Sequence, residues 1–148
     1  MKNELTILNQ LQKVLTEKLN NYIPDEYERL DEKCFNVDFP DTDSMPRPTM
    51  LYIVPNWAEY QNLTTESDDS NFNLSIFIIC KRDKKENLIK KALTMFNAVY
   101  LLLRSNMTLD GYVDFVESTG LEYYPAVEGE HSVVGAEMSV SVRYTKDF

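Results

Sequence analysis

Residues 132–145, SVVGAEMSVSVRYT, alternate apolar and polar or small side chains over most of their length. The apolar set takes every second position from Val134 to Tyr144. Successive side chains of a β-strand point to opposite faces of its sheet, so this period predicts a strand with one buried face and one hydrated face. The stretch decides the fold class, because half-exposed strands are typical of antiparallel sheets and not of buried parallel ones.

A helix is predicted upstream of this strand, over residues 84–104. Asp83 is a favourable N-cap and Glu86 stands three residues later, which is the spacing of a capping box. Apolar side chains then recur at steps of three and four and form one broad face. These side chains are Leu88, Ile89, Ala92, Leu93, Phe96, Val99, Tyr100 and Leu103. Asn106 and the pair Asp110-Gly111 are expected to end the helix and begin a turn.

A second helix is predicted at the N-terminal end, over residues 4–22. Its apolar stripe has the same helical spacing, and Pro24 ends the pattern. The stripe consists of Leu5, Leu8, Leu11, Leu15, Leu19 and Tyr22.

Three more strands are expected, at residues 49–54, 72–80 and 112–117, because β-branched and aromatic side chains are enriched there. Thr119-Gly120 is expected to form a bulge in the last of them, with the strand continuing over residues 121–124. Residues 72–80 are apolar on both sides in their second half, which predicts a central strand or one whose second face meets a partner.

The connection over residues 31–48 is polar and interrupted by prolines, and only residues 35–39 alternate as a short edge strand could. The element order is therefore α-β-β-α-β-β. This order predicts one α+β domain spanning residues 1–148, with a mostly antiparallel four-stranded sheet and the two main helices packed on one face. A domain of this length buries roughly 70% of the surface of its unfolded chain, so it needs no disulfide or metal to fold.

The net charge of −9 indicates that nucleic acid is not a general partner, because phosphate backbones repel an acidic protein. The basic run at residues 81–85 is interpreted as a hydrated helix start, with a local phosphate contact as the alternative. The first residues lack a continuous apolar stretch, and no apolar run approaches the roughly 20 residues that span a bilayer. We therefore expect synthesis in the cytoplasm and no membrane association.

No residue pattern typical of catalysis is present. The single histidine, His131, lies in an expected loop without a recognisable nucleophile, and Cys34 and Cys80 match neither zinc nor redox spacing. Asp38, Asp41 and Asp43 lack the glycine and distal glutamate of a calcium-binding loop. We therefore expect a protein that is not an enzyme and binds no cofactor or metal.

Aromatic side chains provide the candidate binding residues. Tyr and Trp are enriched at surfaces that are apolar yet tolerate water, and five of them fall near strand ends or loops. The candidate interface comprises Tyr52, Trp57, Tyr60, Tyr123 and Tyr124, together with Arg143 on the last strand. The alternative role of the aromatic residues is to cover the open ends of a small sheet, and the sequence leaves both roles open.

Five elements of the sequence form a recognisable combination. They are the N-terminal helix, the strand pair with its acidic loop, the helix that follows Asp83, the turn LDGYV at residues 109–113 and the closing strand AEMSVSVRY at residues 136–144. Together they resemble the tail-terminator or tail-completion proteins of long-tailed bacteriophages and prophages. The resemblance implies a small α+β virion protein that forms a hexameric ring. Such a ring caps the tail tube and joins it to the head, so the implied partners are further copies of the chain and other tail or connector proteins.

The polar stretch at residues 64–71 is expected to be an exposed loop. In a ring, its residues Glu66, Asp68 and Asp69 could line the channel and let DNA pass without sticking, a hypothesis that fails if neutralising them leaves assembly and DNA passage unchanged. The alternative to a virion role is an acidic protein-binding module, such as an immunity or adaptor protein. Such a module would stay monomeric or dimeric.

Overall fold

A five-stranded sheet with helices on one face forms the framework of the protein. The structure is a computed structural model that describes residues 2–82, 86–124 and 133–147. The helices are α1 (Glu4–Lys18), α2 (Leu88–Ser105) and two short 3-10 turns, η1 (Leu19–Tyr22) and η2 (Glu32–Cys34). The strands are β1 (Phe35–Asn36), β2 (Thr49–Asn62), β3 (Ser67–Lys81), β4 (Phe115–Tyr124) and β5 (Val133–Asp147). The α+β class predicted from the sequence is confirmed.

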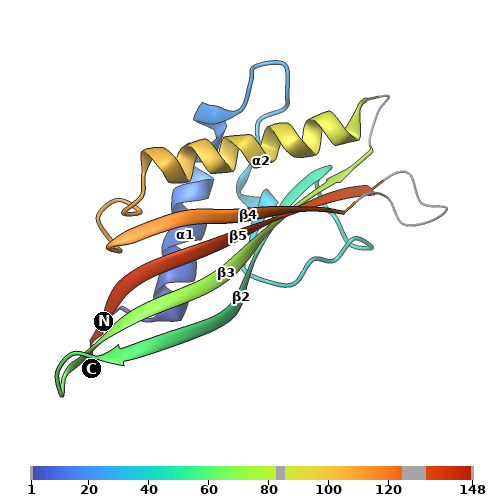
Figure 1. Ribbon diagram of the computed structural model, residues 1–148. Helices are drawn as coiled ribbons and strands as arrows, with labels where there is room; N and C mark the ends of the chain where they lie inside the picture. The colour runs from blue at the N-terminus through green and yellow to red at the C-terminus, as the bar shows by residue number, and fades with distance from the viewer. Residues whose placement is uncertain (1, 83–85, 125–132, 148) are drawn as a thin grey trace.

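The sheet has the strand order β1-β2-β3-β5-β4 (Figure 1). Every neighbouring pair is antiparallel except β1 and β2, which run parallel with Phe35 beside Leu51. The prediction of four strands was therefore wrong by one, and the sheet is mixed. The additional strand is the front of the predicted edge segment 35–39, and only two of its residues pair.

The β2–β3 hairpin is longer than predicted. Strand β2 continues past Pro55 through a bulge between Pro55 and Trp57, and β3 already begins at Ser67. The expected loop over residues 64–71 is thus mostly strand. Main-chain pairing across the hairpin explains this difference, because polar residues 67–71 bond to β2 on one side and β5 on the other. The predicted bulge in β4 is confirmed as a register shift between Ser118 and Gly120.

Both helices begin at asparagine caps. The Asn3 side chain accepts a hydrogen bond from the backbone of Thr6, and Asn87 does the same for Lys90. Helix α2 therefore starts at Leu88, four residues later than predicted, and the expected cap Asp83 lies outside the described residues. The predicted apolar faces were wrong at Leu5 of α1 and at Ile89 and Tyr100 of α2, because these three side chains are exposed.

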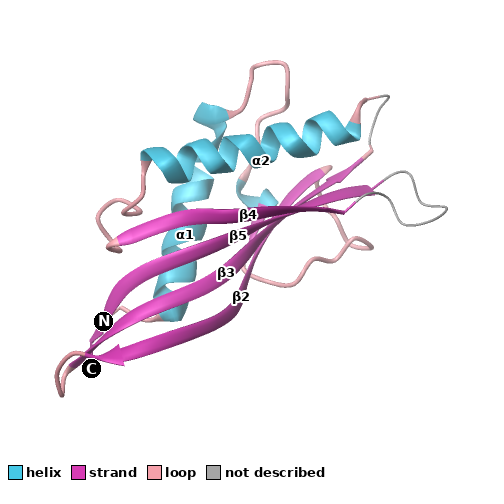
Figure 2. Ribbon diagram, in the orientation of Figure 1, coloured by secondary structure: helices cyan, strands magenta, loops and turns pink. Residues whose placement is uncertain are grey.

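Helices α1 and α2 pack on the same face of the sheet, as predicted. Their buried side chains form one apolar cluster with alternate residues of the strands, such as Leu51, Ile76 and Val140. In Figures 1 and 2 the strands pass in front of α1, and α2 lies along the β4 side. A second, smaller cluster of Met50, Tyr52 and Ile79 lies on the opposite face.

A left-handed turn joins α2 to β4. Leu109 and Asp110 have φ of 50° and 62°, and Gly111 has φ of 81°. Glycine suits this backbone region because it has no Cβ to clash with the chain. The turn predicted at Asp110-Gly111 is confirmed, and it returns the chain along the edge of the sheet.

Candidate functional site

The face of the sheet that points away from α1 and α2 is the candidate functional site. The strand register shows which side chains lie on this face. Phe77 and Ser75 of β3 point to it, and the residues paired with them on neighbouring strands point the same way. We call this surface the open sheet face. Its accessible or partly accessible residues include Asn56, Trp57, Glu59, Asp69, Asn71, Asn73, Phe77, Lys81, Glu117, Glu122, Tyr124, Glu137, Ser139, Ser141 and Arg143.

A hydrogen-bonded row crosses the open sheet face from β4 to β2. The Glu137 carboxylate accepts hydrogen bonds from Tyr124 OH at 2.6 Å and from Ser75 Oγ at 2.8 Å. Asn56 Nδ2 donates to Ser75 Oγ at 2.9 Å and to Asn73 Oδ1 at 3.1 Å. The bond to Glu137, together with desolvation, raises the pKa of Tyr124 above its usual value, so the phenol remains a donor. The row holds polar groups of four strands in fixed positions.

An aromatic contact lies beside this row because β5 has a glycine there. The rings of Phe77 and Tyr124 stack with centroids 6.5 Å apart, and Tyr124 pairs with Gly135. A Cβ at Gly135 would lie 3.1 Å from Ile79 Cδ1 and 3.7 Å from Tyr124 Cβ. Because Gly135 has no side chain, Ile79 and Tyr124 can pack above this position of β5.

The segment that joins β1 to β2 contacts one end of the open sheet face. Met45 packs against the cluster of Met50, Tyr52 and Ile79, and Tyr52 OH donates to the Asp41 carbonyl at 3.5 Å. Toward the hairpin, the side chains of Trp57 and Glu59 are exposed. The accessible part of this face therefore carries aromatic rings as well as polar and acidic side chains.

The six predicted interface residues divide between the two faces. Trp57, Tyr124 and Arg143 lie on the open sheet face, and Trp57 and Tyr124 are 49% and 40% exposed. Tyr60 and Tyr123 lie on the helix side: Tyr60 is stacked under Lys146 Nζ at 4.8 Å, and Tyr123 packs against the core. Tyr52 is buried, which removes it from the accessible surface.

The three predicted channel residues do not share a loop. Glu66 lies in the turn of the β2–β3 hairpin, where the amides of Leu63 and Thr64 donate to the Ser67 carbonyl. Asp68 and Asp69 lie in β3 and point to opposite faces, with Asp68 paired to Lys146 in register. Only Glu66 and Asp69 are exposed.

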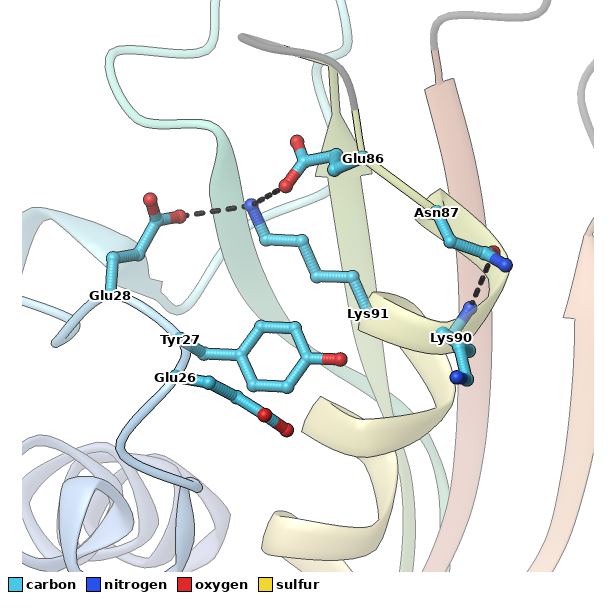
Figure 3. Close-up of a pocket in the computed structure, with 7 residues that line it drawn as sticks. All are labelled: Glu26, Tyr27, Glu28, Glu86, Asn87, Lys90 and Lys91. Carbon is cyan, nitrogen blue, oxygen red and sulfur yellow. Dashed lines mark hydrogen bonds and ion pairs between the residues drawn. The ribbon is translucent and has the colours of Figure 1, made fainter.

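A buried lysine near the start of α2 was not predicted from the sequence (Figure 3). Lys91 is 2% exposed, and its Nζ lies 3.0 Å from Glu28 Oε1 and 3.5 Å from Glu86 Oε2. Glu86 was predicted as part of a capping box, and it instead holds this cation. The signal in the sequence was the position of Lys91 three residues after Leu88, on the buried side of α2. Its partner Glu28 comes from a distant segment, which the sequence pattern does not reveal.

Lys91 has a structural role in this geometry. Burial lowers its pKa, but the hydrogen bond and charge of Glu28 and the charge of Glu86 outweigh that effect and raise the pKa above its usual value. The ammonium group therefore stays charged and ties residues 26–28 to α2. A pocket of about 300 Å³ next to this cluster is lined by Tyr27, Asn87 and Lys90 as well.

The cysteines Cys34 and Cys80 are buried and unbridged. Burial raises the pKa of Cys34 to about 11 and that of Cys80 to about 12, so both remain thiols near neutral pH. Asp41 accepts a bond from the amide of Asp43, and His131 lies outside the described residues. Within residues 2–82, 86–124 and 133–147, no group of three His, Cys, Asp or Glu side chains is arranged to hold a metal ion.

Among the helices that the structure describes, none combines the length and apolar character required to cross a bilayer. A comparison with known protein families finds no match for the sequence, and a search of curated proteins also finds none.

Proposed function

We propose that this protein is a non-catalytic structural subunit that assembles with copies of itself into a ring, as a tail terminator or head–tail joining protein of a phage or prophage. The sequence resemblance motivates this role. The observation that carries it is a sheet covered by helices on one face only, with the other face and two edges accessible. A ring needs two different complementary patches on each copy, and such a sheet offers several.

The two edge strands with unpaired main-chain groups, β2 and β4, lie on opposite sides of the sheet. In the described part of the chain, β4 pairs only with β5, and β2 beyond Tyr52 pairs only with β3. Unpaired edges can add a strand from another chain. Pro55 and a bulge interrupt the β2 edge, and a second bulge interrupts β4. Prolines and bulges limit the addition of a strand from another chain.

The acidic surface supports a second candidate, a monomeric module that binds a basic protein. On the open sheet face, carboxylates outnumber the two cationic groups, Lys81 and Arg143. Charge of this kind steers a basic partner toward the surface. Oligomeric state separates the two candidates, because a module of this kind does not need to assemble.

Light scattering after size-exclusion chromatography over a wide dilution series tests the proposal. We expect the mass to rise in a concentration-dependent way toward a closed multiple of the 17.2-kDa chain, with rings in negative-stain images of the heaviest fraction. A monomer or dimer at every concentration would contradict the ring and favour the second candidate.

The tip of the β2–β3 hairpin is the proposed channel-lining element of the ring. Glu66 and Asp69 supply its exposed carboxylates, and negative charge would repel DNA from the wall. Particles assembled with Glu66→Gln and Asp69→Asn should retain DNA during passage more often than unmodified particles. Equal DNA delivery by both would remove the hairpin from the channel.

A further inference from the structure

Helix α2 carries large apolar side chains on its solvent side as well as on its core side. Ile89, Leu101 and Tyr100 are 54%, 52% and 38% exposed. A surface helix normally carries polar residues opposite its core stripe, and a helix that is apolar all round is normally covered. Tyr100 and Leu101 are adjacent, and Ile89 lies about three turns away on the same side of the helix. Exposed apolar side chains of this size indicate an interaction surface.

The same side of α2 is cationic. Lys90 and Arg104 are exposed near its two ends, and the helix contains no Asp or Glu. No salt bridge to a described residue engages either side chain. We call the surface formed by Ile89, Lys90, Tyr100, Leu101 and Arg104 the α2 outer face.

The open sheet face has the complementary character. Trp57 and Tyr124 supply exposed aromatic area, and Glu59, Glu117 and Glu122 are exposed carboxylates without a salt bridge to any residue that the structure describes. The open sheet face is therefore acidic and aromatic, and the α2 outer face is basic and apolar.

The spacing of the charges also agrees. Fourteen residues of helix separate Lys90 from Arg104, which is about 21 Å. Across the sheet, Glu59 and Glu122 lie six residue rows and three strand spacings apart, which is about 24 Å. Flexible Lys and Arg side chains can bridge the small remaining difference.

We propose that the α2 outer face of one copy docks on the open sheet face of the next copy. The two surfaces belong to opposite layers of one molecule, so they cannot pair within a single chain and must join head to tail between copies. Two open sheet faces would repel each other through their carboxylates. The inference rests on the proposed self-assembly and names the contact that makes it.

Paired charge reversals test this contact. The helix variant Lys90→Glu/Arg104→Glu and the sheet variant Glu59→Lys/Glu122→Lys should each associate at least tenfold more weakly than the unmodified protein. An equimolar mixture should regain assembly, because each altered surface then meets a surface of opposite charge on the other variant. Sedimentation velocity measures the association, and Trp57, the single tryptophan, should change its fluorescence as it is covered.

Matched controls carry the same charge changes on surfaces outside the proposed contact. Lys13→Glu/Lys33→Glu and Glu17→Lys/Glu26→Lys alter exposed residues of α1 and the loops after it, and they should associate like the unmodified protein. Urea unfolding of every variant verifies that the fold is retained.

The outcomes separate this contact from the ring itself. Rings that form equally well from the helix variant or the sheet variant alone would overturn the contact and leave the proposed function intact. An unmodified protein that stays monomeric to millimolar concentration would overturn both. If that monomer bound an arginine-rich decapeptide with loss of binding in the sheet variant, the open sheet face would instead serve a different, basic protein.

Discussion

The two faces of the sheet differ in what their side chains contact. On the helix side, Ile76 and Val140 are fully buried in one apolar cluster shared with α1 and α2. On the open sheet face, the adjacent Ser75 bonds to Glu137, and most neighbours of this pair remain polar and partly accessible. The comparison indicates that one face determines whether the protein folds, while the other is available for recognition.

The largest difference in stability between mutations of the two faces should appear at adjacent residues of β3. Ile76→Ala should lower the free energy of unfolding by about 4 kcal/mol, because it removes a fully buried side chain and leaves a cavity. Ser75→Ala, on the opposite face, should cost about 1 kcal/mol through the lost hydrogen bonds. Urea unfolding measures both, and equal losses would contradict the division between faces.

The next largest loss of stability is expected at Lys91, the buried cation at the edge of the helix side. Lys91→Met should cost about 3 kcal/mol, since it leaves Glu86, which is 14% exposed, without its counter-charge. Removing the charges together in Lys91→Met/Glu28→Gln/Glu86→Gln should recover much of the loss. A triple variant less stable than the single one would show that packing of Lys91, and not its charge, matters most.

The helix side should also make the protein sensitive to alkali. Cys80 has a folded pKa of about 12, raised by burial, against roughly 8.5 when unfolded. Its stabilising effect is complete below the unfolded pKa and declines as pH rises toward the folded value, by about 1.4 kcal/mol per pH unit. Urea midpoints between pH 8 and pH 10 should therefore fall less steeply in Cys80→Ala. An unchanged slope would mean that the thiol ionises equally in both states.

A smaller effect is expected from the row on the open sheet face. Tyr124→Phe removes the donor to Glu137 but keeps the ring on Phe77, so it should cost about 0.5–1 kcal/mol. Thermal unfolding measures this cost. A loss as large as that of Ile76→Ala would give the row a role in folding that its exposure does not indicate.

The smallest effect is expected for the exposed carboxylates of the same face. Glu59→Gln/Glu117→Gln/Glu122→Gln should keep stability within about 0.5 kcal/mol of the unmodified protein, because these side chains are solvated. Association between copies should nevertheless weaken. A triple variant that unfolds readily would place these residues among the determinants of the fold.

Local sequence patterns predicted the elements that rely on their own periodicity. Strand β5 and helix α2 each bury one regular face, so the spacing of their apolar residues carries the information. Strand β1 has only two paired residues, and its existence depends on Leu51 and Tyr52 far along the chain. The polar start of β3 is likewise a strand because β2 and β5 flank it.

The candidate site was predictable only in part, for a related reason. Trp57, Tyr124 and Arg143 were identified by residue type, but their common surface follows from strand register. Tyr60 has the same chemistry but faces the helix side, since neighbouring residues of a strand face opposite ways. Tyr52 belongs to the same face as Trp57 but is buried. The buried Lys91 is neutralised by nearby Glu86 and by Glu28 from a distant segment, and no local pattern contains the second partner.

The two ends of the described chain meet at the hairpin end of the sheet (Figure 1). Glu4, in the first turn of α1, pairs with Lys146 of β5 at 3.1 Å. A short linker could therefore connect the two ends of the described chain, and the chain could be opened instead in the exposed turn at residues 63–66. The product would be a circular permutant with the same packing. An affinity tag or fluorophore attached at the opened turn would lie far from α2.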